Sequence, residues 1–174
     1  VIDAKPTESA AADPRAIALS WGSRQLLAQV NAWTSRATPI TQIHVSRRGS
    51  FGRTLIEASD YALPALGYVA RYGDVCQSLV RTLEQTGVQQ LRPMQVTGNE
   101  ESSEEVMLAL SDGQVLRAGL LVQAEGGVFG EQAARTVQHD YDQTAIVATI
   151  HASAALTGRA FERFTSEGPL ALLP

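Results

Sequence analysis

The sequence predicts a mixed α/β (α+β) fold, and three stretches carry that prediction. Residues Thr41 to Arg47 alternate between apolar and polar side chains, as a half-buried strand does. Val75 to Thr86 carries an apolar stripe at helical spacing. The run Leu120 to Val122 is short, apolar and branched, which is typical of a strand buried on both faces. Helices and two kinds of strand therefore share one chain.

Composition limits the classes of function. The 174 residues are 44% hydrophobic and 18% charged, which is a globular composition long enough for one domain or slightly more. The net charge is -4, and no lysine- or arginine-rich patch with interleaved aromatics is apparent, so nucleic acid is not expected as a partner.

The single cysteine and the absence of long apolar stretches bear on location. Cys76 has no partner for an internal disulfide, and no apolar stretch approaches the roughly 20 residues of a membrane span. No signal peptide is visible. We expect a cytoplasmic protein with at most peripheral contact to the inner membrane. The strand-like ends, Val1 to Ala4 and Leu170 to Pro174, suggest a piece excised from a longer protein.

The first half of the chain is expected to alternate loops, helices and strands. Ser20 is a suitable N-cap for a helix reaching about Trp33, and Asp74 with Gln77 forms a capping box for the helix from Val75. Lys5–Asp13 is expected to be a surface loop. Gly49–Gly52 is expected to be a hairpin connection to the strand Arg53–Glu57, and Gly67–Arg71 is expected to be a short extended piece.

The second half is expected to be richer in strands. Glu100 to Glu105 is an exposed acidic hairpin loop, Ser111 to Gly113 is a tight turn, and Glu131 to Val137 is one or two helical turns. The strand candidates are Val88–Leu91, Met94–Thr97, Val106–Leu110, Ala145–Ile150 and the alternating Arg159–Phe164.

A few residues suit binding chemistry. Glu125, Gly126 and Gly127 follow the Leu120–Val122 strand, where open α/β sheets place ligand sites; an ordinary turn with a solvated glutamate is the alternative. Arg15 precedes a helix and is placed to meet an anion or, more simply, to form a surface salt bridge. Cys76 is expected to be packed and inert. The histidines have no ligand-like spacing, and motifs of nucleophilic enzymes are absent.

Several separated stretches resemble a known family. They are the turn at Glu125-Gly126 and three blocks, Asp13–Ser20, Gly158–Thr165 and Gly168–Pro174. With these stretches the chain resembles the FAD-dependent aromatic-ring monooxygenases, and within them the hydroxylases of ubiquinone biosynthesis. The resemblance implies a partial Rossmann-type FAD-binding domain plus a mixed, largely antiparallel substrate-domain sheet. It places the first in residues 1–38 and 66–137 and the second in 39–65 and 138–174.

The resemblance also implies roles for individual residues. Asp3 matches the acidic residue that accepts a hydrogen bond from the FAD ribose, and Arg15 matches an arginine at the FAD pyrophosphate. Arg71 and Tyr72 match a strand-to-helix junction near the flavin. Glu125 and Gly126 stand where the family has Asp-Gly, so the carboxylate is one methylene longer here. No catalytic acid or base and no metal ligand is assigned.

Two hypotheses about function follow. In the first, the chain is part of a monooxygenase that hydroxylates a polyprenyl phenol with FAD, NAD(P)H and oxygen, and Phe161 and Phe164 face the aromatic ring. The family's glycine-rich loop would precede Val1 and its second Gly-Asp motif would follow Pro174, so little activity is expected from the isolated chain. In the second, the chain is a non-catalytic module that assembles with quinone-biosynthesis proteins.

Overall fold

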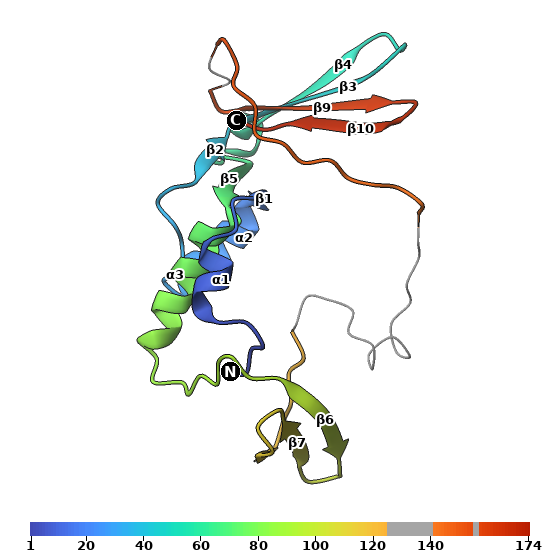
Figure 1. Cartoon of the computed structure of the whole chain (residues 1–174). Helices are drawn as coiled ribbons and strands as arrows, with labels where there is room; N and C mark the ends of the chain where they lie inside the picture. Colours follow the sequence, from blue (N-terminus) through green and yellow to red (C-terminus); the bar gives the residue numbers. More distant parts are fainter. Residues whose placement is uncertain (125–140, 155–156) are drawn as a thin grey trace. The chain divides into compact units, whose positions relative to one another are not determined.

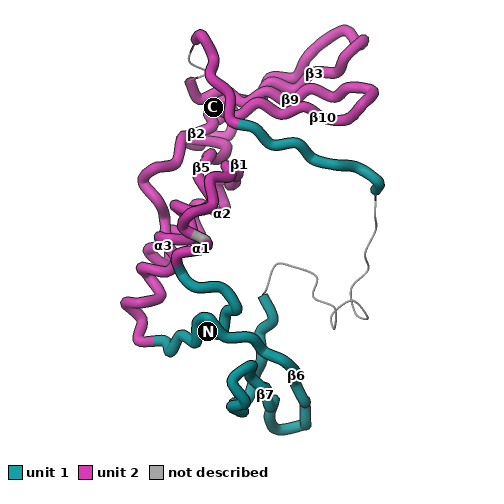
Figure 2. The backbone as a smooth tube through the Cα atoms, in the orientation of Figure 1, with its two compact units in different colours: residues 1–7, 88–148 teal, residues 8–87, 149–174 magenta. Residues whose placement is uncertain are grey.

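The protein comprises two compact units in the part of the chain that can be described. The computed structural model describes residues 1–124, 141–154 and 157–174 (Figure 1). Unit 1 comprises Val1–Thr7 and Val88–Ala148, and unit 2 comprises Glu8–Gly87 and Thr149–Pro174 (Figure 2). The division into a FAD-binding and a substrate-binding domain concerns function and stays a prediction.

Unit 2 contains two sheets. The first has the strand order β1-β5-β2 and is antiparallel throughout. The second has the order β10-β9-β3-β4; its β3–β4 and β9–β10 pairs are antiparallel, and β3 pairs with β9 in parallel. The bounds are β1 Ala16–Ser20, β2 Thr38–Ile40, β3 Gln42–Arg47, β4 Arg53–Glu57, β5 Gly67–Arg71, β9 Arg159–Thr165 and β10 Gly168–Leu172. The prediction of a mixed, largely antiparallel sheet is confirmed.

Helix α2, Trp21–Gln29, begins where the sequence places it. Ser20 caps α2, because its side chain accepts a hydrogen bond from the Ser23 amide at 3.1 Å, as predicted. α2 ends at Gln29, before the predicted end at Trp33. A short helix lies within the stretch predicted as a loop. The described helical segments are α1 Thr7–Ala11, whose first residue belongs to unit 1, α2 Trp21–Gln29, the 3-10 turn η1 Ala58–Tyr61 and α3 Tyr72–Glu84.

The start of α3 differs from the prediction. Its N-cap is Arg71 and no side chain caps it, whereas the sequence pattern favours Asp74. The Tyr72 amide instead donates to the Arg15 carbonyl at 2.8 Å, and the Gly73 amide donates to the Asp13 carbonyl. A neighbouring backbone segment thus satisfies the first amides of the helix, and a side-chain cap is unnecessary. The carboxylate of Asp74 forms an ion pair with Arg36 at 3.3 Å.

The core of unit 2 lies where its two sheets meet. Ile40, Val69 and Ala160 are buried against one another, and Ile43 packs against them. Ile43 is paired with Ala160 across the parallel β3–β9 ladder. Since Ile40 and Val69 belong to the other sheet, this cluster joins the two sheets of the unit.

An aromatic cluster covers the β5 side of α2. The Tyr68 ring lies 6.3 Å from the Trp21 ring and 5.0 Å from the Trp33 ring, measured between centroids. The Arg24 guanidinium stands over both tryptophans, at 5.1 and 5.8 Å. Cation–π contacts of this kind stabilise an arginine beside apolar surface. Trp33 therefore packs in this cluster, although it lies beyond the end of α2.

Unit 1 contains a three-stranded antiparallel meander in the order β6-β7-β8, with β6 Val96–Glu101, β7 Val106–Leu110 and β8 Val115–Ala118. β6 starts two residues later than predicted and runs into the acidic stretch, where the Ser102 amide donates to the Glu105 carbonyl and closes the turn. The predicted strand Val88–Leu91 forms only an isolated parallel bridge, between Ile2 and Leu91.

Two predicted strands are wrong. Leu120–Val122 and Ala145–Ile150 have no regular structure, and nearly all of their side chains are exposed: 78% for Leu120 and 91% for Ile146, while Leu121 is half-buried. A strand needs a neighbour to satisfy its backbone amides and carbonyls, and no described strand pairs with either segment. The predicted turns of Glu131–Val137 lie outside the described residues.

A matched pair of glycine substitutions tests the packing of β5 on β1. A Cβ at Gly67 would lie 2.6 Å from the Leu19 carbonyl oxygen, whereas a Cβ at Gly98 would meet nothing within 4 Å. Gly67→Ala is expected to lower the free energy of unfolding by about 1 to 3 kcal/mol. Gly98→Ala is expected to raise it by up to about 1 kcal/mol, because a strand glycine is entropically unfavourable. Urea denaturation measures both, and equal effects would contradict the packing.

Candidate functional site

The strand-to-helix junction of β5 and α3 brings together three of the predicted site residues. Arg71 ends β5, Tyr72 begins α3, and Arg15 immediately precedes β1. Because Ala16 pairs with Arg71 across the β1–β5 ladder, Arg15 lies beside the helix start. The Arg15 guanidinium stands 5.5 Å from the centre of the Tyr72 ring. These contacts lie within unit 2.

Asp13 positions the Arg15 side chain. Its Oδ2 accepts from Arg15 Nη2 at 2.6 Å, and both carboxylate oxygens accept from Nε at 3.0 Å. Its Oδ1 also accepts from the Arg15 amide at 3.0 Å. This pairing raises the pKa of the Arg15 guanidinium, chiefly through the hydrogen bonds. The Arg15 side chain remains 68% exposed, so an anion in solution can reach it.

Asp13 was not among the predicted site residues, although the sequence holds a signal for it. An aspartate two residues before an arginine can close a local turn onto that residue's amide while its carboxylate meets the guanidinium. The pattern Asp13-Pro14-Arg15 fits that geometry. The structure thus combines the two alternatives considered for Arg15, because the arginine forms a surface salt bridge and is also accessible to an anion.

Tyr72 and Cys76 lie one turn apart on α3 and interact. The hydrogen bond with the Cys76 thiol is the main reason why the pKa of the Tyr72 phenol is raised, while the positive charge of Arg15 opposes the shift. Cys76 is half-buried and is a free thiol. The partial burial of Cys76 agrees with the expectation of a packed cysteine. Sequence spacing alone did not indicate that its partner is Tyr72.

Asp3 lies in unit 1, at the end of the bridge between Ile2 and Leu91. Its amide donates to the Leu91 carbonyl at 3.1 Å and its carbonyl accepts from the Met94 amide at 2.9 Å. Its carboxylate accepts from the Lys5 amide at 2.9 Å and pairs with the largely buried Arg92 at 3.2 Å. A carboxylate held in this way has further lone pairs to accept hydrogen bonds from hydroxyl groups.

Phe161 and Phe164 lie on opposite faces of β9, because side chains alternate along a strand and the two are three residues apart. Phe161 is half-buried, and its ring centre lies 5.4 Å from that of His44, its partner on β3. Phe164 is more exposed. The two phenylalanines therefore cannot line a single face of this sheet.

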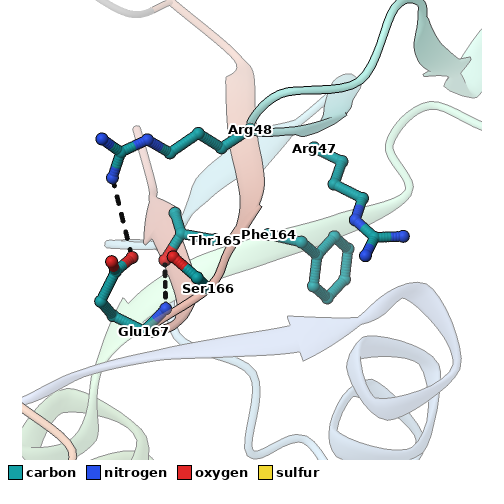
Figure 3. Close-up of a pocket in the computed structure, with 6 residues that line it drawn as sticks. All are labelled: Arg47, Arg48, Phe164, Thr165, Ser166 and Glu167. Carbon is teal, nitrogen blue, oxygen red and sulfur yellow. Dashed lines mark hydrogen bonds and ion pairs between the residues drawn. The ribbon is translucent and has the colours of Figure 1, made fainter.

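Phe164 contributes to an open depression of about 420 Å³ at the end of β3 and the β9–β10 turn (Figure 3). Arg48 faces Glu167 across it at 3.7 Å, and the Glu167 amide donates to Thr165 Oγ1 at 3.2 Å. Hydrogen bonds, first from the Ser166 hydroxyl, lower the pKa of Glu167. The lining residues are Arg47, Arg48, Phe164, Thr165, Ser166 and Glu167.

Two predicted site residues cannot be placed. Glu125 and Gly126 lie outside the described residues. Among the residues that are described, no cluster of histidine, cysteine and acidic side chains could hold a metal ion. No helix within the same ranges is both long enough and apolar enough to cross a bilayer.

Comparison with known sequences is informative over nearly the whole chain. The chain is 30% identical to the mitochondrial ubiquinone biosynthesis monooxygenase COQ6 of Rattus norvegicus, and the match covers 92% of this chain and 37% of that protein. It is 31% identical to the ubiquinone hydroxylase UbiL of Rhodospirillum rubrum, over 100% of this chain and 43% of that protein. The chain is homologous to the ubiquinone-biosynthesis monooxygenases. It spans about two fifths of their length, and no family model matches it.

Solved structures agree on the fold. The crystal structure of FqzB matches 94% of this chain and 40% of its own with a TM-score of 0.57 at 16% identity. The p-nitrophenol 4-monooxygenase PnpA of Pseudomonas putida matches 68% of this chain and 32% of its own with a TM-score of 0.53, also at 16% identity. The mixed α/β class is thereby confirmed, and the identities to COQ6 and UbiL confirm the resemblance inferred from the sequence. The roles of the individual site residues stay predictions.

The Tyr72–Cys76 contact predicts an unusual tyrosine titration. Tyr72 is expected to ionise above the ordinary tyrosine pKa of about 10, and Cys76→Ala should lower its pKa toward that value. Because the folded pKa is raised, the contribution to stability is complete below about pH 10 and is lost as pH rises through the folded pKa. Tyrosinate absorbance of the chain, with that of Tyr72→Phe subtracted, measures the titration. A Tyr72 pKa that Cys76→Ala leaves unchanged would contradict the contact.

Proposed function

We propose that this chain is part of a longer FAD-dependent monooxygenase that hydroxylates a polyprenyl phenol in ubiquinone biosynthesis. The observation that carries the proposal is the 31% identity to the ubiquinone hydroxylase UbiL along the complete chain. The chain spans about two fifths of its relatives, and the exposed apolar segments 120–122 and 145–150 offer surface that a larger fold would cover.

The described residues fit parts of an FAD molecule. The exposed Arg15 guanidinium, which Asp13 holds in place, suits a phosphate oxygen, since a guanidinium donates along several directions at once. The Asp3 carboxylate suits ribose hydroxyls. The first amides of α3 already bond to backbone carbonyls, so a phosphate near this junction would be bound by the Arg15 side chain rather than by the helix N-terminus.

In this proposal the chain's residues bind and orient while the cofactor supplies the redox chemistry. FAD, when bound, supplies transfer of electrons from NAD(P)H and activation of oxygen for insertion into the phenol ring. Arg15 would neutralise phosphate charge, Asp3 would fix the ribose, and Tyr72 with Arg71 would border the flavin. Glu125 and Gly126 would act at the position of the family's Asp-Gly motif.

The phenol would meet one face of the β10-β9-β3-β4 sheet. The ladder places Leu172, Phe161, His44 and Leu55 in one row on that face, because directly paired residues share a face. A half-buried aromatic ring beside an imidazole and aliphatic side chains suits an electron-rich aromatic substrate. Phe164, on the opposite face, would contact a different part of the substrate or of the protein.

We further propose a cytoplasmic location with peripheral contact to the inner membrane, where a polyprenyl substrate would be found. Association with other quinone-biosynthesis proteins belongs to the same proposal.

The non-catalytic alternative shares the fold and differs in the rest of the gene. Sequencing the transcript on both sides decides between them. In-frame coding sequence with a glycine-rich loop upstream supports the monooxygenase, and start and stop codons at the present ends would exclude it.

Arg15→Ala in the full-length protein is expected to weaken FAD binding about ten- to hundredfold, as loss of a charge-assisted hydrogen bond does. Arg117→Ala is the matched control, since Arg117 also pairs with an acidic residue and is 67% exposed, close to the value for Arg15. Flavin fluorescence titration measures both affinities. Equal affinities for the two variants would remove Arg15 from the site.

Phe161→Ala is expected to lower the rate of phenol hydroxylation and to increase NAD(P)H oxidation without product, because a looser pocket positions the ring less well. Phe164→Ala tests the opposite face in the same assay. Product formation and NAD(P)H consumption are measured together in the full-length enzyme. If both variants keep the wild-type rate and coupling, the assignment of this sheet to the substrate fails.

A further inference from the structure

The β3–β4 hairpin (Figure 1) ends in a turn that contains one aromatic residue, Phe51. Phe51 is fully exposed. Gly49 and Gly52, on either side of it, have φ values of +75° and +94°, which only glycine adopts readily. The Ser50 amide donates to the Arg47 carbonyl at 3.3 Å and closes the turn. The loop is therefore built to present Phe51 rather than to bury it.

Positive charge surrounds this aromatic tip. Arg47, Arg48 and Arg53 are all exposed, and no acidic residue occurs from Ile43 to Ile56. Arg48 meets Glu167 at 3.7 Å, but both side chains are mostly exposed, and such pairs are weak. The expectation that the chain has no arginine-rich patch beside an aromatic is thus corrected. The net charge of -4 conceals this local excess of arginine.

The basic and apolar character continues along one face of the sheet. Ser46 pairs with Arg53 on one side and with Arg163 on the other, and Arg163 pairs with Leu170. Directly paired residues share a face, so Arg53, Arg163 and Leu170 form one row near the tip. Arg163 is exposed, as is 64% of Leu170. The row adds a further cation and an aliphatic side chain to the surface that begins at Phe51.

We propose that this hairpin tip docks on the surface of an anionic phospholipid bilayer. Phe51 enters the boundary between headgroups and acyl chains, and Arg47, Arg48 and Arg53 bind lipid phosphates, as amphipathic membrane-surface segments do. Charge complementarity identifies the partner. A single projecting aromatic suits a soft apolar boundary, whereas single-stranded nucleic acid is bound through several aromatic platforms along a basic groove. This proposal assigns a surface to the peripheral membrane contact proposed above, on which it rests, and it does not depend on hydroxylase activity.

Sedimentation of the full chain with vesicles tests the proposal. At low salt the chain is expected to bind vesicles of phosphatidylcholine with phosphatidylglycerol, and not vesicles of phosphatidylcholine alone. Phe51→Ser should weaken binding about tenfold, since it removes the apolar contact. Arg53→Gln should weaken it about fivefold, and Arg53→Lys should retain it, because a bilayer surface requires only the charge.

Two matched controls accompany these variants. Tyr61→Ser removes an exposed aromatic outside the tip, and Arg81→Gln removes an exposed arginine on α3. Both should bind like the wild type. Equal binding to both vesicle types, no binding at low salt, or equal losses in tip and control variants would overturn the proposal. So would a wild-type dimer that Phe51→Ser converts to a monomer, or vesicle binding that a short oligonucleotide abolishes, because the tip would then serve a second copy or a nucleic acid.

Discussion

The parallel pairing of β3 with β9 is the contact on which unit 2 depends. It begins at Thr41 and Gly158, which are 117 residues apart. The Gly158 carbonyl accepts from the Thr41 amide at 2.7 Å, the Gln42 amide at 3.0 Å and the Thr41 hydroxyl at 3.1 Å. Closing a flexible loop of that length costs about 4 kcal/mol in chain entropy, apart from a constant. A concentrated set of donors on one carbonyl helps to offset that cost.

Gly158 is suited to this junction for two reasons. Its φ is +66°, a conformation that side chains disfavour, and a Cβ there would lie 2.6 Å from Thr41 Oγ1. From this point the ladder sets Ala160 against Ile43 in the core and Phe161 beside His44 on the other face. One backbone position thereby fixes the register that places the buried cluster and the proposed substrate row on opposite faces of the same strands.

The features that were predicted from sequence depend on local signals. The Ser20 cap, the hairpin between Thr41 and Glu57, and the turn at Ser111 to Gly113 each arise within a few residues. The features that were missed depend on neighbours distant in the sequence. α3 starts at Tyr72 because the segment just before β1 supplies the Asp13 and Arg15 carbonyls to its first amides. Ala145 to Ile150 has strand propensity but no described strand beside it, and propensity cannot supply a partner.

In the candidate site, too, local contacts can be predicted from the sequence and distant ones cannot. The resemblance indicated Arg15 and Tyr72 separately, but their contact follows from the β1–β5 register, which no local pattern encodes. Asp13, two residues from Arg15, was within reach of local reasoning because an Asx residue before an arginine is a recognisable arrangement. The contact between Tyr72 and Cys76 could not be predicted, because it joins two residues one helical turn apart and the sequence pattern started α3 after Tyr72.

Charge on this chain is segregated in a way that its sum hides. Eighteen acidic and fourteen basic residues give the net charge of -4, yet Glu100, Glu101, Glu104 and Glu105 cluster at one hairpin, and Arg47, Arg48 and Arg53 cluster at another. At physiological ionic strength a charge acts over about 8 Å, so a partner at either hairpin experiences the local charge rather than the total. An acidic chain can therefore present a basic surface. Net charge limits the partners of the protein only where its charges are evenly mixed.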